Sequence, residues 1–306
     1  MFQYKIFSIK KEQKESLEQL GTKEKFWFKD ESVNNLFKVG RDNTGEDWVE
    51  VVVADICSLL GLPHAKYSFA VYESLQGTIT TSFVPDGGRL VHGNELLAKA
   101  YKTLDIEYEE NTFYKVRNYN IRIIHAILSH AEFNPAFNII KYDEFDTAFD
   151  MFVGYIVLDC LISNQDRHHE NWGLIVLGQM LFLAPTFDHA SGLGSKEHDI
   201  KKSKRLSGSD PRVTMKHFVE RARTPFYDKG KILTTYEAVE ACAKLNPKFT
   251  LYWLKKIDNI DLDKIQEIFG KIPSTLISSI SIEFAIEMIK ENKNRLLVIK
   301  RKLESE

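Results

Sequence analysis

The chain has 306 residues, of which 43% are hydrophobic and 27% are charged, a composition typical of a globular protein rather than a disordered or fibrous one. Forty-one Lys and Arg residues nearly balance 43 Asp and Glu residues, which leaves a formal net charge of −2. This balance argues against nucleic acid and anionic membranes as partners. No run of about 18 apolar residues is present, which excludes a membrane-spanning helix.

The N-terminal sequence lacks the charged segment, apolar core and cleavage site of a signal peptide. Three cysteines, Cys57, Cys160 and Cys242, lie far apart in apolar helical patterns, so we expect them to be reduced core residues. We therefore expect a cytoplasmic protein. Export as an effector that needs no cleaved signal peptide is the alternative.

The first ninety residues favour a small sheet. Short segments rich in Phe, Tyr, Val and Ile and bounded by turn residues predict strands at 2–9, 26–29, 35–39, 66–73 and 77–84. One helix interrupts them, because apolar residues from Val49 to Leu60 recur at helical spacing before the stop signal Gly61-Leu62-Pro63. The cluster F-V-P-D-G-G-R at 83–89 is the candidate boundary, which predicts an N-lobe at 1–88 and a C-lobe at 89–306.

Beyond this boundary the pattern becomes helical. Apolar residues recur every three or four positions at 94–103, 112–130, 146–163, 211–222, 235–245, 262–270 and 281–304. A strand pair at 172–177 and 180–183, joined through Gly178-Gln179, interrupts the helices. The predicted fold class is α+β, with a small sheet-containing lobe, a larger helical lobe and a cleft between them.

The segment S-N-Q-D-R-H-H-E-N-W-G, from Ser163 to Gly173, concentrates polar residues between a long apolar helix and the strand pair. Asp166 and Asn171 are separated by four residues, the interval at which a kinase catalytic loop places its base and a magnesium ligand. A short loop can direct the carboxylate to the acceptor and the amide oxygen to the metal. On its own this spacing is common, and a polar loop with an Asx turn is the plain alternative.

A second carboxylate strengthens this interpretation. The apolar stretch M-L-F-L-A-P-T-F leads directly into Asp188, at the point where a kinase places its magnesium-chelating Asp. The residues that follow are His189-Ala190 rather than Phe-Gly, so the eukaryotic kinase signature is absent. A strand-end Asp that caps the next turn is the alternative.

A lysine and a glutamate in the first lobe complete the candidate set. Lys38 lies on the strand N-L-F-K-V-G, and Glu50 lies on the helix that follows, as in the ion pair that kinases assemble on activation. Glu46 is the rival to Glu50, and a solvated Lys on an edge strand is the alternative for Lys38.

A glycine and a hydroxyl precede the second predicted strand. Gly21, Thr22 and Lys23 predict a loop that wraps phosphates with backbone N–H groups, although they do not form G-x-G-x-x-G. The stretch from Gly40 to Gly45 is not a P-loop, because the acidic pair Glu46-Asp47 follows it where Lys-Ser would be required.

These motifs together resemble those of the HipA-like serine/threonine kinases, and the chain looks most like the compact, CtkA-like type. The resemblance rests on S-N-Q-D-R-H-H-E-N-W-G, on L-A-P-T-F-D-H-A-S-G-L and on the lysine strand with its glutamate helix, and it covers positions 21 to 194. It implies a bilobal protein-kinase-like fold and ATP with Mg²⁺ as cofactors. Carried over by residue, it implies that Asp166 is the base, that Asn171 and Asp188 are magnesium ligands, and that Glu50 orients Lys38 toward the phosphates.

Further nucleotide contacts are predicted by analogy with kinases. Phe83 and Val84 lie in the expected hinge beside the adenine, and His168 is the motif histidine that braces the loop. The adjacent His168 and His169 do not favour zinc, since no H-E-x-x-H pattern or cysteine partner accompanies them. The basic segment 196–206 predicts contact with an acidic or phosphorylated substrate region, with a solvated loop as the alternative.

The sequence thus predicts an enzyme that transfers the γ-phosphoryl group of Mg-ATP to a Ser or Thr hydroxyl of a protein substrate. Autophosphorylation is an expected further reaction, with Thr22, Ser203 and Ser207 as candidates, and an antitoxin or other regulator is an expected partner. A lipid or small-molecule phosphotransferase is one alternative. A non-catalytic toxin–antitoxin binding module is the other, although the Lys and both Asp residues needed for catalysis are present. The resemblance extends to growth-arresting toxins and to secreted effectors alike.

Overall fold

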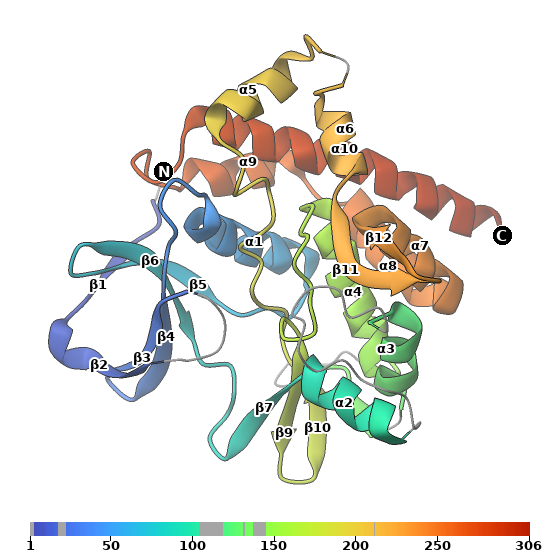
Figure 1. Ribbon diagram of the computed structural model, residues 1–306, viewed down its shortest axis with the longest axis horizontal. Coiled ribbons are helices and arrows are strands. Elements are labelled where there is room, and N and C mark those ends of the chain that lie inside the picture. The colour runs from blue at the N-terminus through green and yellow to red at the C-terminus, as the bar shows by residue number, and fades with distance from the viewer. Residues whose placement is uncertain (1–2, 18–22, 104–118, 131, 137–144, 211) are drawn as a thin grey trace.

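A computed structural model describes residues 3–17, 23–103, 119–130, 132–136, 145–210 and 212–306. A strand-rich region at the N-terminal end faces a larger helical region, and helix α1 lies between them (Figure 1). Among the described residues, no helix combines the length and the apolar character needed to cross a membrane.

A six-stranded sheet forms the N-terminal region, in the order β1-β5-β6-β4-β3-β2. Its strands are β1 (Ile6–Ile9), β2 (Lys14–Leu17), β3 (Lys25–Asp30), β4 (Val33–Val39), β5 (Tyr67–Tyr72) and β6 (Leu75–Thr81), with the short 3-10 helix η1 (Lys11–Gln13) before β2. Side chains alternate across the sheet. Phe26 and Phe37 therefore bury one face with Tyr72, while Lys38, next along β4, points to the other face.

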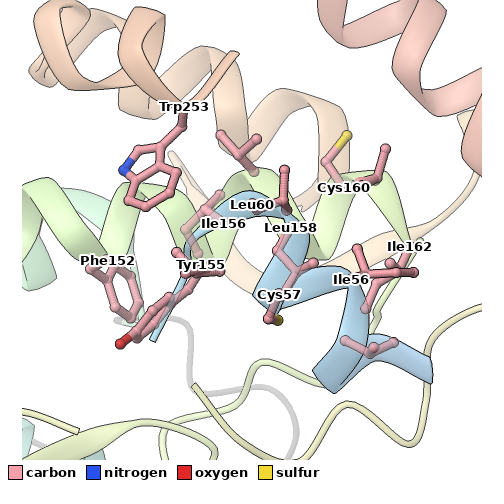
Figure 2. Close-up of a cluster of buried hydrophobic side chains, with 14 of the residues drawn as sticks. Ile56, Cys57, Leu60, Phe152, Tyr155, Ile156, Leu158, Cys160, Ile162 and Trp253 are labelled. Carbon is pink, nitrogen blue, oxygen red and sulfur yellow. The ribbon is translucent and has the colours of Figure 1, made fainter. Parts of the chain in front are cut away.

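Helix α1 (Glu46–Leu60) lies against that other face and contacts β5 and β6. It ends as predicted at Gly61, whose φ of 69° is the left-handed conformation that glycine adopts at low cost. Apolar side chains of α1 pack directly against those of α4 (Ala148–Leu161), with Trp253 on the far side of α4 (Figure 2). One hydrophobic core is therefore continuous from α1 into the helical region.

Helix α4 is the centre of the helical region, since every one of its side chains is buried. Its first turn is fixed by a capping box between Thr147 and Asp150, and Trp253 donates a hydrogen bond to the Asp150 carbonyl at 2.9 Å. The remaining helices are α2 (Gly93–Thr103), α3 (Ile121–Leu128), α5 (Asp199–Ser207), α6 (Met215–Glu220), α7 (Thr235–Leu245), α8 (Pro247–Asp258), α9 (Leu262–Gly270) and α10 (Ser279–Ser305).

Two smaller sheets complete the structure. One has the order β7-β9-β10-β8, and its strands are β7 (Gly88–His92), β8 (Phe133–Asn134), β9 (Gly173–Leu177) and β10 (Met180–Leu183). The other is the hairpin of β11 (Arg223–Asp228) and β12 (Lys231–Thr234). The predicted strand pair at 172–183 is confirmed as the β9–β10 hairpin, and it carries the chain from the Asp166 loop to Asp188.

Several predicted elements differ from the structure. The predicted helix at 112–130 is described only from residue 119, and α3 begins at Ile121. The one at 211–222 is shortened to α6, which starts after its N-cap Thr214 and ends before β11. The segment 196–206, for which a solvated loop was the alternative, forms helix α5 from Asp199 onward, and Lys202 is its only buried residue. The sequence analysis did not predict β2, β7, β8, β11, β12 and α8. The domain boundary at residue 88 stays a prediction.

Candidate active site

Lys38 is held between two carboxylates, one from each side of the site. Its Nζ lies 3.3 Å from Asp188 Oδ2 and 3.7 Å from Glu50 Oε1, and its side chain is only 11% exposed. Strand β4 directs the lysine toward α1, and the second turn of α1 presents Glu50 to it. The predicted pair of Lys38 and Glu50 is therefore brought together, and Asp188 joins it.

Burial and charge act in opposite directions on these three groups. Burial alone would lower the pKa of Lys38, but Asp188 and Glu50 reverse this and raise it. Burial would raise the pKa of Asp188, but Lys38, Lys23 and Lys25 together outweigh burial and hold that pKa below its ordinary range. Burial raises the pKa of Glu50 to about 7, although Lys38 opposes the shift. Asp188 is therefore the carboxylate that stays ionised beside Lys38.

Glu46, the rival to Glu50, has other partners. Its Oε2 lies 2.8 Å from Lys23 Nζ and its Oε1 lies 3.2 Å from Arg41 Nη1. Glu46 is 2% exposed, so this arrangement joins α1 to the chain segments on either side of β3 and β4. Glu50 thus pairs with Lys38, whereas Glu46 pairs with Lys23 and Arg41.

Backbone hydrogen bonds fix Asp188 in an uncommon conformation. Its φ is 59°, a left-handed value that costs free energy for a residue with a side chain. The Asp188 N–H donates to the Tyr67 hydroxyl at 3.1 Å, and the His189 N–H donates to Glu50 Oε2 at 2.9 Å. One carboxylate of α1 therefore contacts Lys38 through one oxygen and holds the Asp188 turn through the other.

Asp166 and Asn171 are joined within their loop. The Asn171 side-chain nitrogen donates to the Asp166 carbonyl at 2.6 Å, which leaves the amide oxygen as the atom able to bind a cation. Asp166 Oδ2 accepts a hydrogen bond from the Ser191 hydroxyl at 3.2 Å, and Lys196 donates to the same hydroxyl at 3.1 Å. His168 Nε2 lies 3.8 Å from the other Asp166 oxygen, Oδ1. The Ser191 hydroxyl thus donates a hydrogen bond to the carboxylate that we predict to act as the base.

Arg167, the residue after Asp166, connects the loop to the segment between β10 and Asp188. Its guanidinium forms two 2.8 Å hydrogen bonds to the Asp159 carboxylate of α4 and is 1% exposed. The same group donates to the carbonyls of Asn171 at 2.8 Å and Phe187 at 3.3 Å. Paired in this way, a buried charge can fix loop geometry.

The other predicted nucleotide contacts have mixed outcomes. Gly21 and Thr22 lie outside the described residues. Lys23 is described and is paired with Glu46. The Phe83 ring stacks on Phe187 with centroids 5.5 Å apart, next to Asp188. The Val84 N–H donates to the Ser82 hydroxyl at 3.3 Å, so the group predicted to face an adenine is engaged locally.

The sequence analysis did not identify four residues that lie near the site. Lys25 on β3 is paired in register with Lys38 on β4, so both lysines lie on one face, and Lys25 helps to lower the pKa of Asp188. Alternation along K-F-W-F-K-D could have indicated this lysine. Asp159 and Arg167 form a contact between the last turn of α4 and the loop that follows it, for which an acid inside an apolar helix is the only signal. Ser191 carried no signal.

The oxygen donors of the site fit magnesium better than they fit a metal ion that is bound by protein side chains alone. Among the described residues, no group of three or more His, Cys, Asp or Glu side chains could hold a metal ion. Magnesium is commonly bound through one or two carboxylates, waters and substrate phosphates. The Asn171 amide oxygen and the Asp188 carboxylate are the oxygen donors that would hold it.

Comparisons with known proteins identify the fold. No protein-family model matches the chain. The serine/threonine-protein kinase CtkA of Helicobacter pylori (strain J99) is 27% identical over 159 residues, which are 48% of this chain and 43% of that protein. The match thus spans less than half of the relative's length. The solved structure of the Helicobacter pylori proinflammatory kinase CtkA has a TM-score of 0.76 at 19% identity and covers 98% of this chain and 99% of that chain.

The fold is that of a HipA-like, CtkA-type kinase. HipA of Shewanella oneidensis MR-1, solved with HipB and operator DNA, has a TM-score of 0.58 at 12% identity and covers 96% of this chain and 65% of that chain. The predicted resemblance and the predicted bilobal kinase-like fold are confirmed. The roles of individual site residues stay predictions.

Proposed function

We propose that the protein is a serine/threonine protein kinase that transfers the γ-phosphoryl group of Mg-ATP to a Ser or Thr hydroxyl. The observation that carries this proposal is the position of Lys38 Nζ, 3.3 Å from Asp188 and 3.7 Å from Glu50. A buried lysine between a helix glutamate and an aspartate that follows a β-hairpin is the arrangement with which kinases bind phosphates.

Each residue then has a defined task in the transfer. Asp166 accepts the proton of the acceptor hydroxyl. The hydroxyl oxygen forms a bond to the γ-phosphorus as the bond between that phosphorus and the β-phosphate oxygen breaks, which releases ADP. Lys38 neutralises charge on the phosphates, and Glu50 keeps Lys38 in place. Magnesium held by Asn171 and Asp188 would supply further neutralisation of the phosphate oxygens.

A protein substrate is the acceptor that the relatives favour. CtkA is named a serine/threonine-protein kinase, and HipA was solved together with HipB, so a protein regulator of this chain belongs to the same proposal. The three cysteines are free and buried, which supports a reducing compartment, and we propose a cytoplasmic site of action. Export as an effector stays the alternative.

The test is transfer of labelled γ-phosphate from Mg-ATP, with the protein alone, with a generic basic protein and with lipid vesicles as separate acceptors. We expect label on Ser or Thr of a protein, and its loss in Asp188→Asn. Label on the protein alone would report autophosphorylation. Label on lipid only would overturn the protein-kinase proposal in favour of a lipid phosphotransferase. Nucleotide binding without transfer to any acceptor would favour a non-catalytic binding module.

A further inference from the structure

A cavity of about 360 Å³ opens beside Asp166, on the side of the segment that leads from Asp188 into α5. Besides Asp166, its wall consists of Ser163, Gln165, Ser191, Gly194, Ser195, Lys196, Glu197 and Phe218. The volume can hold an amino-acid side chain with part of its backbone. Because the predicted base lines this cavity, the acceptor residue and its neighbours in sequence have room here.

Besides Asp166, the wall has the acidic residue Glu197, which is already paired with a cation. Its carboxylate accepts a hydrogen bond from Arg205 Nε at 3.2 Å, and the Arg205 guanidinium lies 4.7 Å from the centre of the Phe218 ring. Arg205 is therefore fixed by an acid and an aromatic face. Neither Glu197 nor Arg205 contributes a net charge to the cavity.

Lys196 is the basic residue of the cavity wall. Its Nζ donates to the neutral Ser191 hydroxyl at 3.1 Å, and within the described part of the chain it forms no ion pair with an Asp or Glu. A lysine has three N–H donors, so this single hydrogen bond leaves the ammonium able to bind an anion.

Ser195 supplies a second, independent indication of a ligand. It is 1% exposed, it lines the cavity, and its hydroxyl has no hydrogen-bond partner. A buried hydroxyl without a partner costs free energy unless a ligand or water satisfies it. Lys196 and Ser195 are adjacent residues, and both line the cavity.

We propose that this cavity is an acceptor subsite, and that Lys196 selects a Ser or Thr whose neighbour in the substrate carries an anionic group. The inference rests on the proposed kinase function and narrows its substrate class. A carboxylate side chain and a phosphorylated side chain share the required chemistry. The earlier expectation for the whole basic segment 196–206 is thereby reduced to one lysine, since Lys201 and Lys204 do not line the cavity, Arg205 is engaged with Glu197 and Lys202 is buried.

The test uses the full chain and synthetic peptides that each contain one Ser. Each position next to that Ser is occupied in turn by Glu, by Gln, by Lys or by an analogue of phosphoserine that cannot accept phosphate. At one position, wild type should show a kcat/KM about five-fold higher for Glu than for Gln, the size expected of a partly exposed ion pair. The phosphate-bearing arm distinguishes a phosphorylated from an acidic substrate.

Variants at Lys196 sharpen the result. Lys196→Gln should abolish the preference for Glu, and Lys196→Glu should reverse it in favour of Lys, with the KM for ATP unchanged in both. Lys201→Gln is the matched control, because Lys201 is an exposed lysine of α5 outside the cavity wall. It should keep the preference.

Three outcomes would overturn the inference. Transfer to Ser peptides without any preference at a neighbouring position would leave the kinase proposal intact and refute the subsite. A Lys196→Gln variant that raises the KM for ATP and slows all peptides equally would assign Lys196 to the nucleotide instead. Absence of transfer to every peptide and protein acceptor would remove the kinase proposal and this inference together.

Discussion

Arg167 and Lys38 are both buried cations at the same site, and they are held in different ways. Arg167 forms two 2.8 Å hydrogen bonds to Asp159 and donates to two backbone carbonyls. Lys38 meets Asp188 and Glu50 at 3.3 and 3.7 Å. The planar fork of arginine suits fixed, bidentate contacts, whereas a lysine is a point charge on a flexible stem. We infer that Arg167 fixes the loop, while Lys38 can exchange a carboxylate for an arriving phosphate.

Removal of Arg167 should give the largest effect on stability. Arg167→Leu leaves the Asp159 carboxylate buried without its partner, so we expect the free energy of unfolding to fall by about 3–5 kcal/mol. Chemical denaturation measures this change. The exposed pair of Arg122 and Asp228 is the control, and Arg122→Leu should cost less than about 1 kcal/mol. Equal losses in the two variants would mean that Arg167 does not brace the loop.

Removal of Lys38 should act on the reaction more than on the fold. Lys38→Met removes the charge that faces the phosphates, and we expect kcat/KM for ATP to fall by about 10²- to 10³-fold. Stability should fall less than in Arg167→Leu, because Glu50 can take up a proton. Steady-state kinetics and denaturation of the same sample separate the two effects. A variant that unfolds but retains the specific activity of its folded fraction would contradict the comparison.

The pH dependence should report the ionisation of Glu50. Its pKa is raised by burial to about 7, so Glu50 pairs with Lys38 as a carboxylate only above that pH. We expect kcat/KM to rise through a limb centred near pH 7, and Glu50→Gln to remove that limb. The raised pKa also contributes stability that is complete below the unfolded value of 4.5 and is lost as pH rises through about 7.

Asp47→Asn is the control for this pH profile. Asp47 lies on the same helix, and burial raises its pKa to about 6, but its surroundings are Gly40 and Lys23 rather than Lys38. The limb near pH 7 should therefore persist in Asp47→Asn. If it disappears there and remains in Glu50→Gln, the assignment to Glu50 is wrong.

Loss of the Ser191 hydroxyl, which donates to Asp166, should have the smallest effect on the reaction. Ser191→Ala removes the hydrogen bond to Asp166 Oδ2, and we expect kcat to fall by about ten-fold or less with the KM for ATP unchanged. Ser191→Thr keeps the hydroxyl and should restore most of the rate, which a purely structural role would not require. Full activity in Ser191→Ala would show that Asp166 does not depend on this contact for its position.

Local patterns explain what the sequence predicted. The N-terminal strands and α1 were found because alternation and the Gly61 stop are encoded by neighbouring residues, and Lys38 and Glu50 were found because each has a fixed place on such an element. Asp188 was found from the apolar stretch before it, although it lies beyond the end of β10 at Leu183. Helix α5 was not predicted, since its sequence D-I-K-K-S-K-R-L-S has almost no apolar periodicity. Helix α8 begins with Pro247 at its first turn, where proline is tolerated, and this start signal was overlooked.

Contacts between distant segments could not be predicted in the same way. Strand β7 pairs with β9 across about eighty residues, and β8 has two residues, too few for any period. The Arg167–Asp159 pair is close in sequence, but it joins a loop to the end of a helix whose apolar residues conceal the acid. Ser191 reaches Asp166 only because the chain turns back after Asp188. These features depend on tertiary packing rather than on local sequence.

The central claim is that Asp166 acts as the base on a nucleotide bound beside Lys38. The most direct measurement is single-turnover transfer of labelled γ-phosphate by wild type and Asp166→Asn, with ATP affinity determined on the same samples. We predict that Asp166→Asn binds Mg-ATP with nearly the affinity of wild type and transfers phosphate at least about 10²-fold more slowly. Transfer at the wild-type rate by Asp166→Asn would contradict the account.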